Sequence, residues 1–252
     1  MLIDTHCHIQ MPPLDKDTEG AIIRANKAGV GKMIVVGCDL ELSKKAIEIA
    51  ENHVGIFASV ALHPQDAKKF NETMWEEFEK MAENKKVIAI GETGLDFFKE
   101  YSPREQQIMV YKKHIELALK VNKPLIIHNR EADEDSLRIL QEFGVKNAVF
   151  HCYASGVQFA RKVWKAGYFT SFTGIITYPK SNELRAVVEE CPMDCLMVET
   201  DCPFLAPQKY RGNTNEPAFT VEVAAEIARI KNKQFKEIEE ITTRNAEGFF
   251  GI

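Results

Sequence analysis

The chain has 252 residues, of which 45% are hydrophobic and 27% charged, so it is long enough for one large core or two small domains. No apolar run approaches the roughly 18 residues that span a bilayer, and no basic-then-apolar stretch marks a secretion signal. The six cysteines form no C-x-x-C pair, which is typical of reduced thiols. A net charge of −5 argues against a protein that binds long duplex DNA through the phosphate backbone of the DNA. We expect a monomeric cytoplasmic protein with no membrane partner.

Short apolar runs alternate with longer amphipathic stretches along the whole chain. Strands are predicted for the apolar runs at 1–6, 32–37, 55–62, 86–92, 124–128, 147–151, 168–172 and 195–200. Helices are predicted for the amphipathic stretches at 18–29, 40–53, 73–85, 103–122, 135–144, 157–167, 181–190, 216–232 and 235–251.

Eight strands alternating with helices over about 250 residues is the count and length of an α/β (β/α)8 TIM barrel. Continuous apolar runs such as "MIVVG" suit parallel strands covered by helices. A doubly wound open sheet is the main alternative, but it usually has fewer strands at this length. No linker or low-complexity tract marks a boundary, so we predict a single barrel domain over residues 1–252.

The first strand carries Asp4, His6 and His8 at every second position, which sends all three to one face. Buried polar side chains cost several kcal/mol unless something satisfies them. Either a metal ion or a hydrogen-bonded polar patch meets that need, and these residues alone do not decide between the two.

Histidines and carboxylates recur where the other predicted strands end. The later positions are His63, Glu92, His128, His151 and Asp201, whereas His53 and His114 fall in helical patterns and are interpreted as surface or packing residues. In a barrel the C-terminal strand ends form the active face, so we expect these groups to converge.

Four imidazoles and two carboxylates exceed what one tetrahedral ion uses. We therefore predict two divalent ions about 3.5–4 Å apart, held by His6, His8, Glu92, His128, His151 and Asp201, with Glu92 as the bridge. Imidazole ligation favours Zn²⁺ or Mn²⁺ over Mg²⁺, although only weakly. A buried polar network without metal is the alternative.

Motifs along the entire chain resemble the TatD family of metal-dependent deoxyribonucleases. They include "IDTHCHI", "LHP", "AIGETGLDFF", "IIHNREADED", "VFHCY", "SFTGIITY", "VETDCPFLAP" and "RGNTNEP", in this order. The resemblance implies that His6, His8, Glu92 and Asp201 hold one metal, and that Glu92, His128 and His151 hold the other. It also implies that His63 faces the substrate phosphate, that Arg130 matches the family's fifth-strand arginine, and that Arg211 lies near the active face.

These residues support a hypothesis of phosphodiester hydrolysis, with Asp201, Glu92 and His63 as catalytic residues and His63, Arg130 and Arg211 as substrate contacts. A salt bridge from Arg130 to Glu92 or Glu199 is an equal alternative. Glu199 and Asp4 are predicted to orient ligands.

The expected partner is DNA or another phosphodiester bound by a chain end, because an acidic protein lacks a long basic groove. Phe97, Phe98, Tyr178 and Phe204 can stack a base or merely pack. The predicted activity is that of a 3′-to-5′ exonuclease using two Mg²⁺, Mn²⁺ or Zn²⁺ ions. Alternatives are a hydrolase of an amide, lactone or small phosphoester, and a binding scaffold without turnover.

Overall fold

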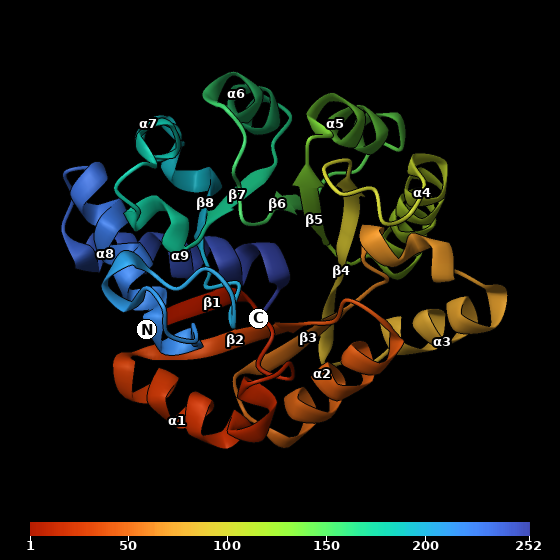
Figure 1. The fold of residues 1–252 in the computed structure, drawn as a ribbon, viewed down its shortest axis with the longest axis horizontal. Helices are drawn as coiled ribbons and strands as arrows, with labels where there is room; N and C mark the ends of the chain where they lie inside the picture. The colour runs from red at the N-terminus through yellow and green to blue at the C-terminus, as the bar shows by residue number, and fades with distance from the viewer. The chain divides into compact units, whose positions relative to one another are not determined.

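The computed structural model describes residues 1–252, in which eight strands alternate with helices (Figure 1). The strands are β1 Leu2–Cys7, β2 Val30–Val36, β3 Ile56–Val60, β4 Val87–Asp96, β5 Leu125–Arg130, β6 Ala148–Phe150, β7 Phe169–Phe172 and β8 Leu196–Val198. The helices are α1 Thr18–Ala28, α2 Leu40–Asn52, α3 Glu72–Ala82, α4 Arg104–Val121, α5 Asp133–Glu142, α6 Val157–Lys165, α7 Asn182–Glu190, α8 Thr220–Ile230 and α9 Phe235–Phe250. Every strand and helix predicted from the sequence is present.

The strands form one sheet in sequence order from β1 to β8, and the described pairings are parallel. Apolar side chains fill the strands as expected, and Ile34, Val35 and Val36 of β2 are fully buried. This is the strand count and order of a (β/α)8 barrel. None of the helices is both long enough and apolar enough to cross a membrane.

The chain divides into two compact units, which we describe separately. The first unit, Met1–Val35 with Cys152–Ile252, contains β1, β7, β8 and nearly all of β2. Helix α9 packs on β1 and β8. On α9, the buried Asn245 amide donates to the carbonyls of Met193 and Leu196, which fixes the start of β8.

The second unit, Val36–His151, contains β3 to β6 with helices α2 to α5. The Asp39 and Asn71 side chains cap α2 and α3 by accepting from the backbone N–H groups of Leu42 and Met74. The Lys123 ammonium donates to the carbonyls of Ala82 and Asn84 at the end of α3. Local capping signals in the sequence thus place these helix ends.

Strand β4 is longer than predicted and continues to Asp96, so Glu92 lies inside it. Gly94 pairs with His128 of β5 and has a φ of +139°, which side chains rarely adopt. A Cβ at this position would lie 2.1 Å from the His128 carbonyl oxygen. Only glycine lets β4 and β5 approach this closely.

Gly94→Ala is therefore expected to destabilise the protein. The positive φ alone costs on the order of 1–3 kcal/mol, and the clash adds to it. Urea unfolding of the metal-free protein measures the loss. The matched control is Gly156→Ala, because Gly156 has a φ of −74° and open space around its Cβ position. Equal stability of the two variants would contradict the close-approach argument.

Candidate metal centre

In the first unit, two histidines of the β1 end meet a carboxylate that follows β8. The Nε2 atoms of His6 and His8 lie 3.1 Å apart. Oδ1 of Asp201 lies 3.7 Å from His6 Nε2 and 3.3 Å from His8 Nε2. Both histidines are buried, and the Asp201 side chain is only 15% exposed. This set is called the β1–β8 cluster.

Hydrogen bonds between the two strand ends hold the β1–β8 cluster in place. The backbone N–H of Asp201 donates to the His6 carbonyl at 2.9 Å. The buried Asp4 carboxylate accepts from the Thr200 N–H at 2.9 Å and from its hydroxyl at 2.6 Å. Burial raises the pKa of Asp4 to about 7, although the hydrogen bonds from Thr200 oppose this shift. The buried Asn215 amide donates to the Thr200 and Phe204 carbonyls, which fixes the loop that follows β8.

In the second unit, three imidazoles face one oxygen of Glu92. Oε1 lies 2.7 Å from His128 Nδ1, 2.8 Å from His151 Nε2 and 3.4 Å from His63 Nε2. Glu92 and His151 are buried, and His63 and His128 are largely so. We call these four residues the Glu92 cluster.

The electrostatics of the Glu92 cluster favour a carboxylate anion. Burial raises the pKa of Glu92, but His151, His63 and His128 outweigh it and hold that pKa well below its usual range. Burial lowers the pKa of His63, and Glu92 opposes this only in part. Burial also lowers the pKa of His128, yet hydrogen bonds to Asp96 and Glu92 raise it overall.

A backbone hydrogen bond determines which ring nitrogen of His63 carries the proton. Nδ1 of His63 accepts from the Gln65 backbone N–H at 3.2 Å, so the neutral ring carries its proton on Nε2, facing Glu92. A protonated Nε2 donates hydrogen bonds and does not bind metal. His63 is thus arranged as a donor, and its contact to a phosphate oxygen stays a prediction.

The donor sets of both clusters fit divalent metal ions. In the Glu92 cluster, His128 Nδ1 and His151 Nε2 lie 2.7 Å and 2.8 Å from Glu92 Oε1 and 3.5 Å from each other. Each cluster combines imidazole nitrogens with a carboxylate, a combination that suits Zn²⁺ and Mn²⁺. A cation would satisfy nitrogen lone pairs that otherwise face each other in a buried site.

His114 of α4 supports the Glu92 cluster from the interior of the second unit. It is fully buried, and Trp75 and Phe78 pack edge-on against its ring. Its Nε2 accepts from the Leu62 N–H at 3.1 Å, and its Nδ1 lies 2.9 Å from the Thr93 hydroxyl. His114 therefore ties together residues adjacent to His63 and to Glu92, and it packs as the sequence suggested.

Neither predicted substrate arginine is paired with a carboxylate. The Arg130 guanidinium lies 3.8 Å from the centre of the Phe98 ring, and Arg211 lies 4.1 Å from that of Tyr178. Arg130 is exposed at the end of β5 and forms no ion pair with Glu92. Both arginines keep donors available to a ligand.

The four aromatic residues proposed for base stacking differ in how accessible their rings are. Phe98 and Phe204 are 49% and 53% exposed, and the Phe204 ring lies edge-on to His8. Phe97 is buried beneath Arg104, so it cannot stack a base. The Tyr178 hydroxyl donates to the Ala206 carbonyl, and Arg211 covers its ring.

Two residues near the Glu92 cluster were missed in the sequence. The Cys38 thiol donates to Glu92 Oε2 at 3.6 Å, and Asp96 Oδ2 lies 3.2 Å from His128 Nε2. The position of Cys38, two residues after the end of β2, was an available signal, because the other strand ends carry the candidate ligands. Asp96 lies four residues beyond Glu92, and only the added length of β4 reveals it.

Glu199 is buried and accepts from the Cys152 N–H at 2.7 Å and from the Ser171 hydroxyl. Its predicted role in orienting a ligand histidine stays a prediction.

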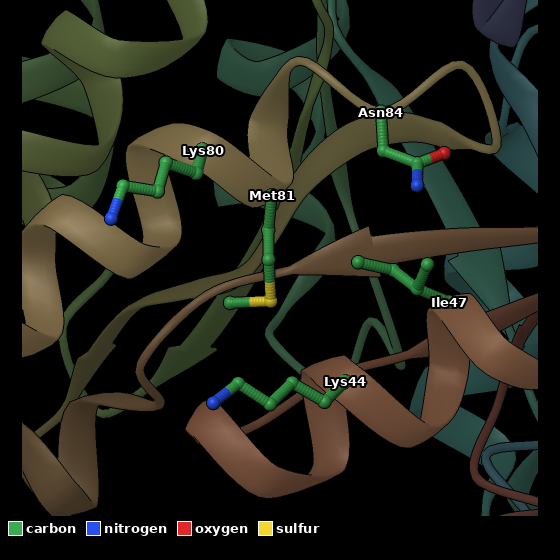
Figure 2. A pocket seen from close by; sticks show the side chains of 5 residues that line it. All are labelled: Lys44, Ile47, Lys80, Met81 and Asn84. Atoms are coloured by element: carbon green, nitrogen blue, oxygen red, sulfur yellow. The ribbon is translucent and has the colours of Figure 1, made fainter.

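A hollow of about 310 Å³ lies elsewhere on the second unit, between α2 and α3 (Figure 2). It is lined by Lys44, Ile47, Lys80, Met81 and Asn84. Glu77 lies 3.0 Å from the Lys80 ammonium and 3.9 Å from that of Lys44, so their charges are partly neutralised. The hollow has no residue of either histidine cluster.

Comparison with solved structures identifies the class of protein. The chain is similar to YjjV, a TatD homologue from Escherichia coli K12, with a TM-score of 0.95 and 30% identity over 100% of this chain and 98% of that one. A TatD-family hydrolase from Entamoeba histolytica has the same fold, with a TM-score of 0.90 and 23% identity over 99% of this chain and 97% of that one. The predicted (β/α)8 barrel is confirmed.

The family model described as TatD related DNase matches residues 3–251. The metal-dependent hydrolase YabD of Bacillus subtilis strain 168 is 40% identical over the full length of both chains. The metal-dependent hydrolase TatD of Mycobacterium tuberculosis is 34% identical over 100% of this chain and 98% of its own. The chain belongs to the TatD family, and it is a metal-dependent hydrolase.

His114 gives the fold a specific acid sensitivity. Burial lowers the pKa of His114 from 6.5 to about 3. Between these values the unfolded chain takes up a proton that the folded protein does not, so the free energy of unfolding falls as the pH drops below 6.5. His114→Gln is expected to reduce this slope by up to about 1.4 kcal/mol per pH unit. Urea unfolding of metal-free protein from pH 4.5 to 7.5 measures it, and identical slopes for both proteins would refute the assignment.

Proposed function

We propose that this TatD-family hydrolase is a deoxyribonuclease that removes nucleotides from the 3′ end of DNA with two divalent metal ions. The observation that carries the proposal is the Glu92 cluster, in which a buried carboxylate oxygen faces three imidazole nitrogens. The family description as a TatD related DNase supports the choice of a phosphodiester substrate.

We propose further that the β1–β8 cluster and the Glu92 cluster serve one centre. The support is the fold class, because the C-terminal strand ends of a (β/α)8 barrel surround a single active face. His6, His8, Asp201 and Glu92 would hold one ion, and Glu92, His128 and His151 the other. Bound there, two divalent ions polarise a phosphate and lower the pKa of water.

In this proposal each residue has a definite task in hydrolysis. Asp201 accepts a proton from the attacking water as its oxygen bonds to phosphorus, and returns it to the leaving oxygen when the P–O bond breaks. The Nε2–H of His63 donates to a non-bridging phosphate oxygen. Arg130, whose ring contact leaves its N–H edges accessible, binds a second phosphate oxygen.

A chain end suits this protein better than the middle of a duplex. The net charge of −5 repels a long polyanion, whereas a terminal nucleotide needs only the local positive charge of Arg130 and Arg211. Phe98 and Phe204 present exposed rings beside predicted site residues, so the proposed base contact involves these two aromatics.

The second candidate is hydrolysis of an amide, lactone or small phosphoester. The observation behind it is the naming of the relatives, which are described as metal-dependent hydrolases with no stated substrate. Glu92 on β4 favours the nuclease, because many barrel hydrolases of other bonds use a carboxylated lysine from that strand.

The decisive assay follows 5′-labelled single-stranded DNA with chelator-stripped protein and added Mg²⁺, Mn²⁺ or Zn²⁺. We expect a metal-dependent ladder that shortens from the 3′ end. Asp201→Asn should lower the rate about 100-fold or more, since it removes the base. Asp194→Asn, an exposed carboxylate in the same unit, is the control. If the protein binds ions but cleaves no DNA with any metal, the result would contradict the nuclease and favour hydrolysis of an amide, lactone or small phosphoester.

The stacking role of Phe204 has its own test. Phe204→Ala is expected to raise KM for single-stranded DNA by roughly fivefold or more, because base stacking on an aromatic ring contributes about 1–3 kcal/mol. The kcat should stay near that of the wild type, since the ring holds no reacting atom. Phe235→Ala, another partly exposed phenylalanine, is the control. An unchanged KM would remove Phe204 from the substrate site.

A further inference from the structure

We propose that Asp96 positions His128 as a metal ligand by fixing which ring nitrogen carries the proton. This inference rests on the proposed metal centre but not on the identity of the substrate. His128 lies between two carboxylates, with Nδ1 2.7 Å from Glu92 Oε1 and Nε2 3.2 Å from Asp96 Oδ2. An ion bound at Nδ1 would take the lone pair of that nitrogen, so the ring proton would lie on Nε2, where the Asp96 carboxylate accepts it.

Asp96 is held rigidly enough for this task. It is 1% exposed, and its Oδ1 accepts from the backbone N–H groups of Phe98 at 3.1 Å and Lys99 at 3.4 Å. Its own N–H donates to Oε1 of the buried Gln107 at 2.8 Å, and Gln107 Nε2 donates back to the Asp96 carbonyl at 3.0 Å. Both the backbone and the carboxylate are therefore fixed before any ligand binds.

The second oxygen of Asp96 is directed at His128 by Gln65. Gln65 Nε2 donates to Asp96 Oδ2 at 2.6 Å. With the Phe98 and Lys99 N–H groups donating to Oδ1, the Asp96 carboxylate is held with Oδ2 toward His128 Nε2, from which it can accept a hydrogen bond.

Strand β4 supplies both carboxylates that contact the ring nitrogens of His128. Glu92 and Asp96 lie four residues apart on β4, on the same face by the strand period, and the register of β4 with β5 places Asp96 opposite Arg130. His63 differs, because its Nδ1 accepts from a backbone N–H and its Nε2 carries the proton toward Glu92. Among the imidazoles that face Glu92, His128 is therefore oriented to bind a metal ion through Nδ1, and His63 is oriented to donate a hydrogen bond from Nε2.

Asp96→Asn separates this role from a purely structural one. An asparagine can keep its oxygen at the Oδ1 position, where it accepts from Phe98 and Lys99, so the turn after β4 is retained. Its NH₂ then replaces Oδ2 and donates to His128 Nε2, and the Gln65 amide must turn so that its oxygen, in place of its NH₂, faces this group. The ring proton is forced onto Nδ1, which removes the lone pair from the metal side.

The first measurement is nitrogen-15 NMR of the histidine rings in the Zn²⁺-loaded protein. His128→Gln assigns the resonances. We expect the Nε2–H tautomer in the wild type and the Nδ1–H tautomer in Asp96→Asn. An Nδ1–H tautomer in the wild type would overturn the proposal by itself, even if the variant failed to fold.

The second measurement is calorimetric titration of the same proteins with Zn²⁺. Asp96→Asn should weaken binding at the His128 site by about 10- to 100-fold, the usual effect of losing such a partner. Asp135→Asn, an exposed carboxylate paired with Arg138, controls for the lost charge and should bind as the wild type does. Unchanged Zn²⁺ affinity in Asp96→Asn would overturn the positioning role.

The two measurements also separate this inference from the proposed function. A wild-type protein that binds Zn²⁺ but cleaves no DNA would refute the nuclease and leave the role of Asp96 intact. The converse result, DNA cleavage with an unchanged tautomer and Zn²⁺ affinity in Asp96→Asn, would refute the role of Asp96 alone.

Discussion

The buried carboxylate of Glu92 is the group on which the second unit's site depends. An isolated buried anion would cost many kcal/mol, and here imidazoles from three other segments compensate its charge. Without a metal, one or more rings must carry a proton to do so. With a metal, the cation takes over that charge, and metal binding should release protons. One geometric arrangement thus couples folding, protonation and metal binding.

Much of the surrounding structure serves to orient these rings. His114 joins the strand segments that carry His63 and Glu92, and it does so as a neutral group inside an aromatic pocket. Asp96 and the backbone of Gln65 then set the ring nitrogens that face Glu92. Because these partners are buried and bonded on several sides, the proposed ligands are arranged in advance, and less conformational entropy would be lost when an ion binds.

The same structure reconciles an acidic protein with the polyanionic substrate that we propose. Arg130 and Arg211 lie over aromatic rings instead of being neutralised by carboxylates, so their charge acts locally. A planar guanidinium held against a ring loses little entropy when it binds a phosphate oxygen. Local positive charge of this kind suits a chain end, whereas a long duplex would meet the net negative surface.

The sequence by itself determined the order of strands and helices and the candidate ligands at the strand ends, because hydrophobic periodicity and the polar residues at strand ends are local features. Only the tertiary structure decided what orients those ligands. Asp96 meets His128 across 32 residues, and His114 reaches Leu62 across 52. Such contacts depend on strand register and side-chain direction, which short-range patterns do not encode. The choice of candidate ligand residues thus rests on local information, whereas the direction in which each ring nitrogen points is a property of the packed fold.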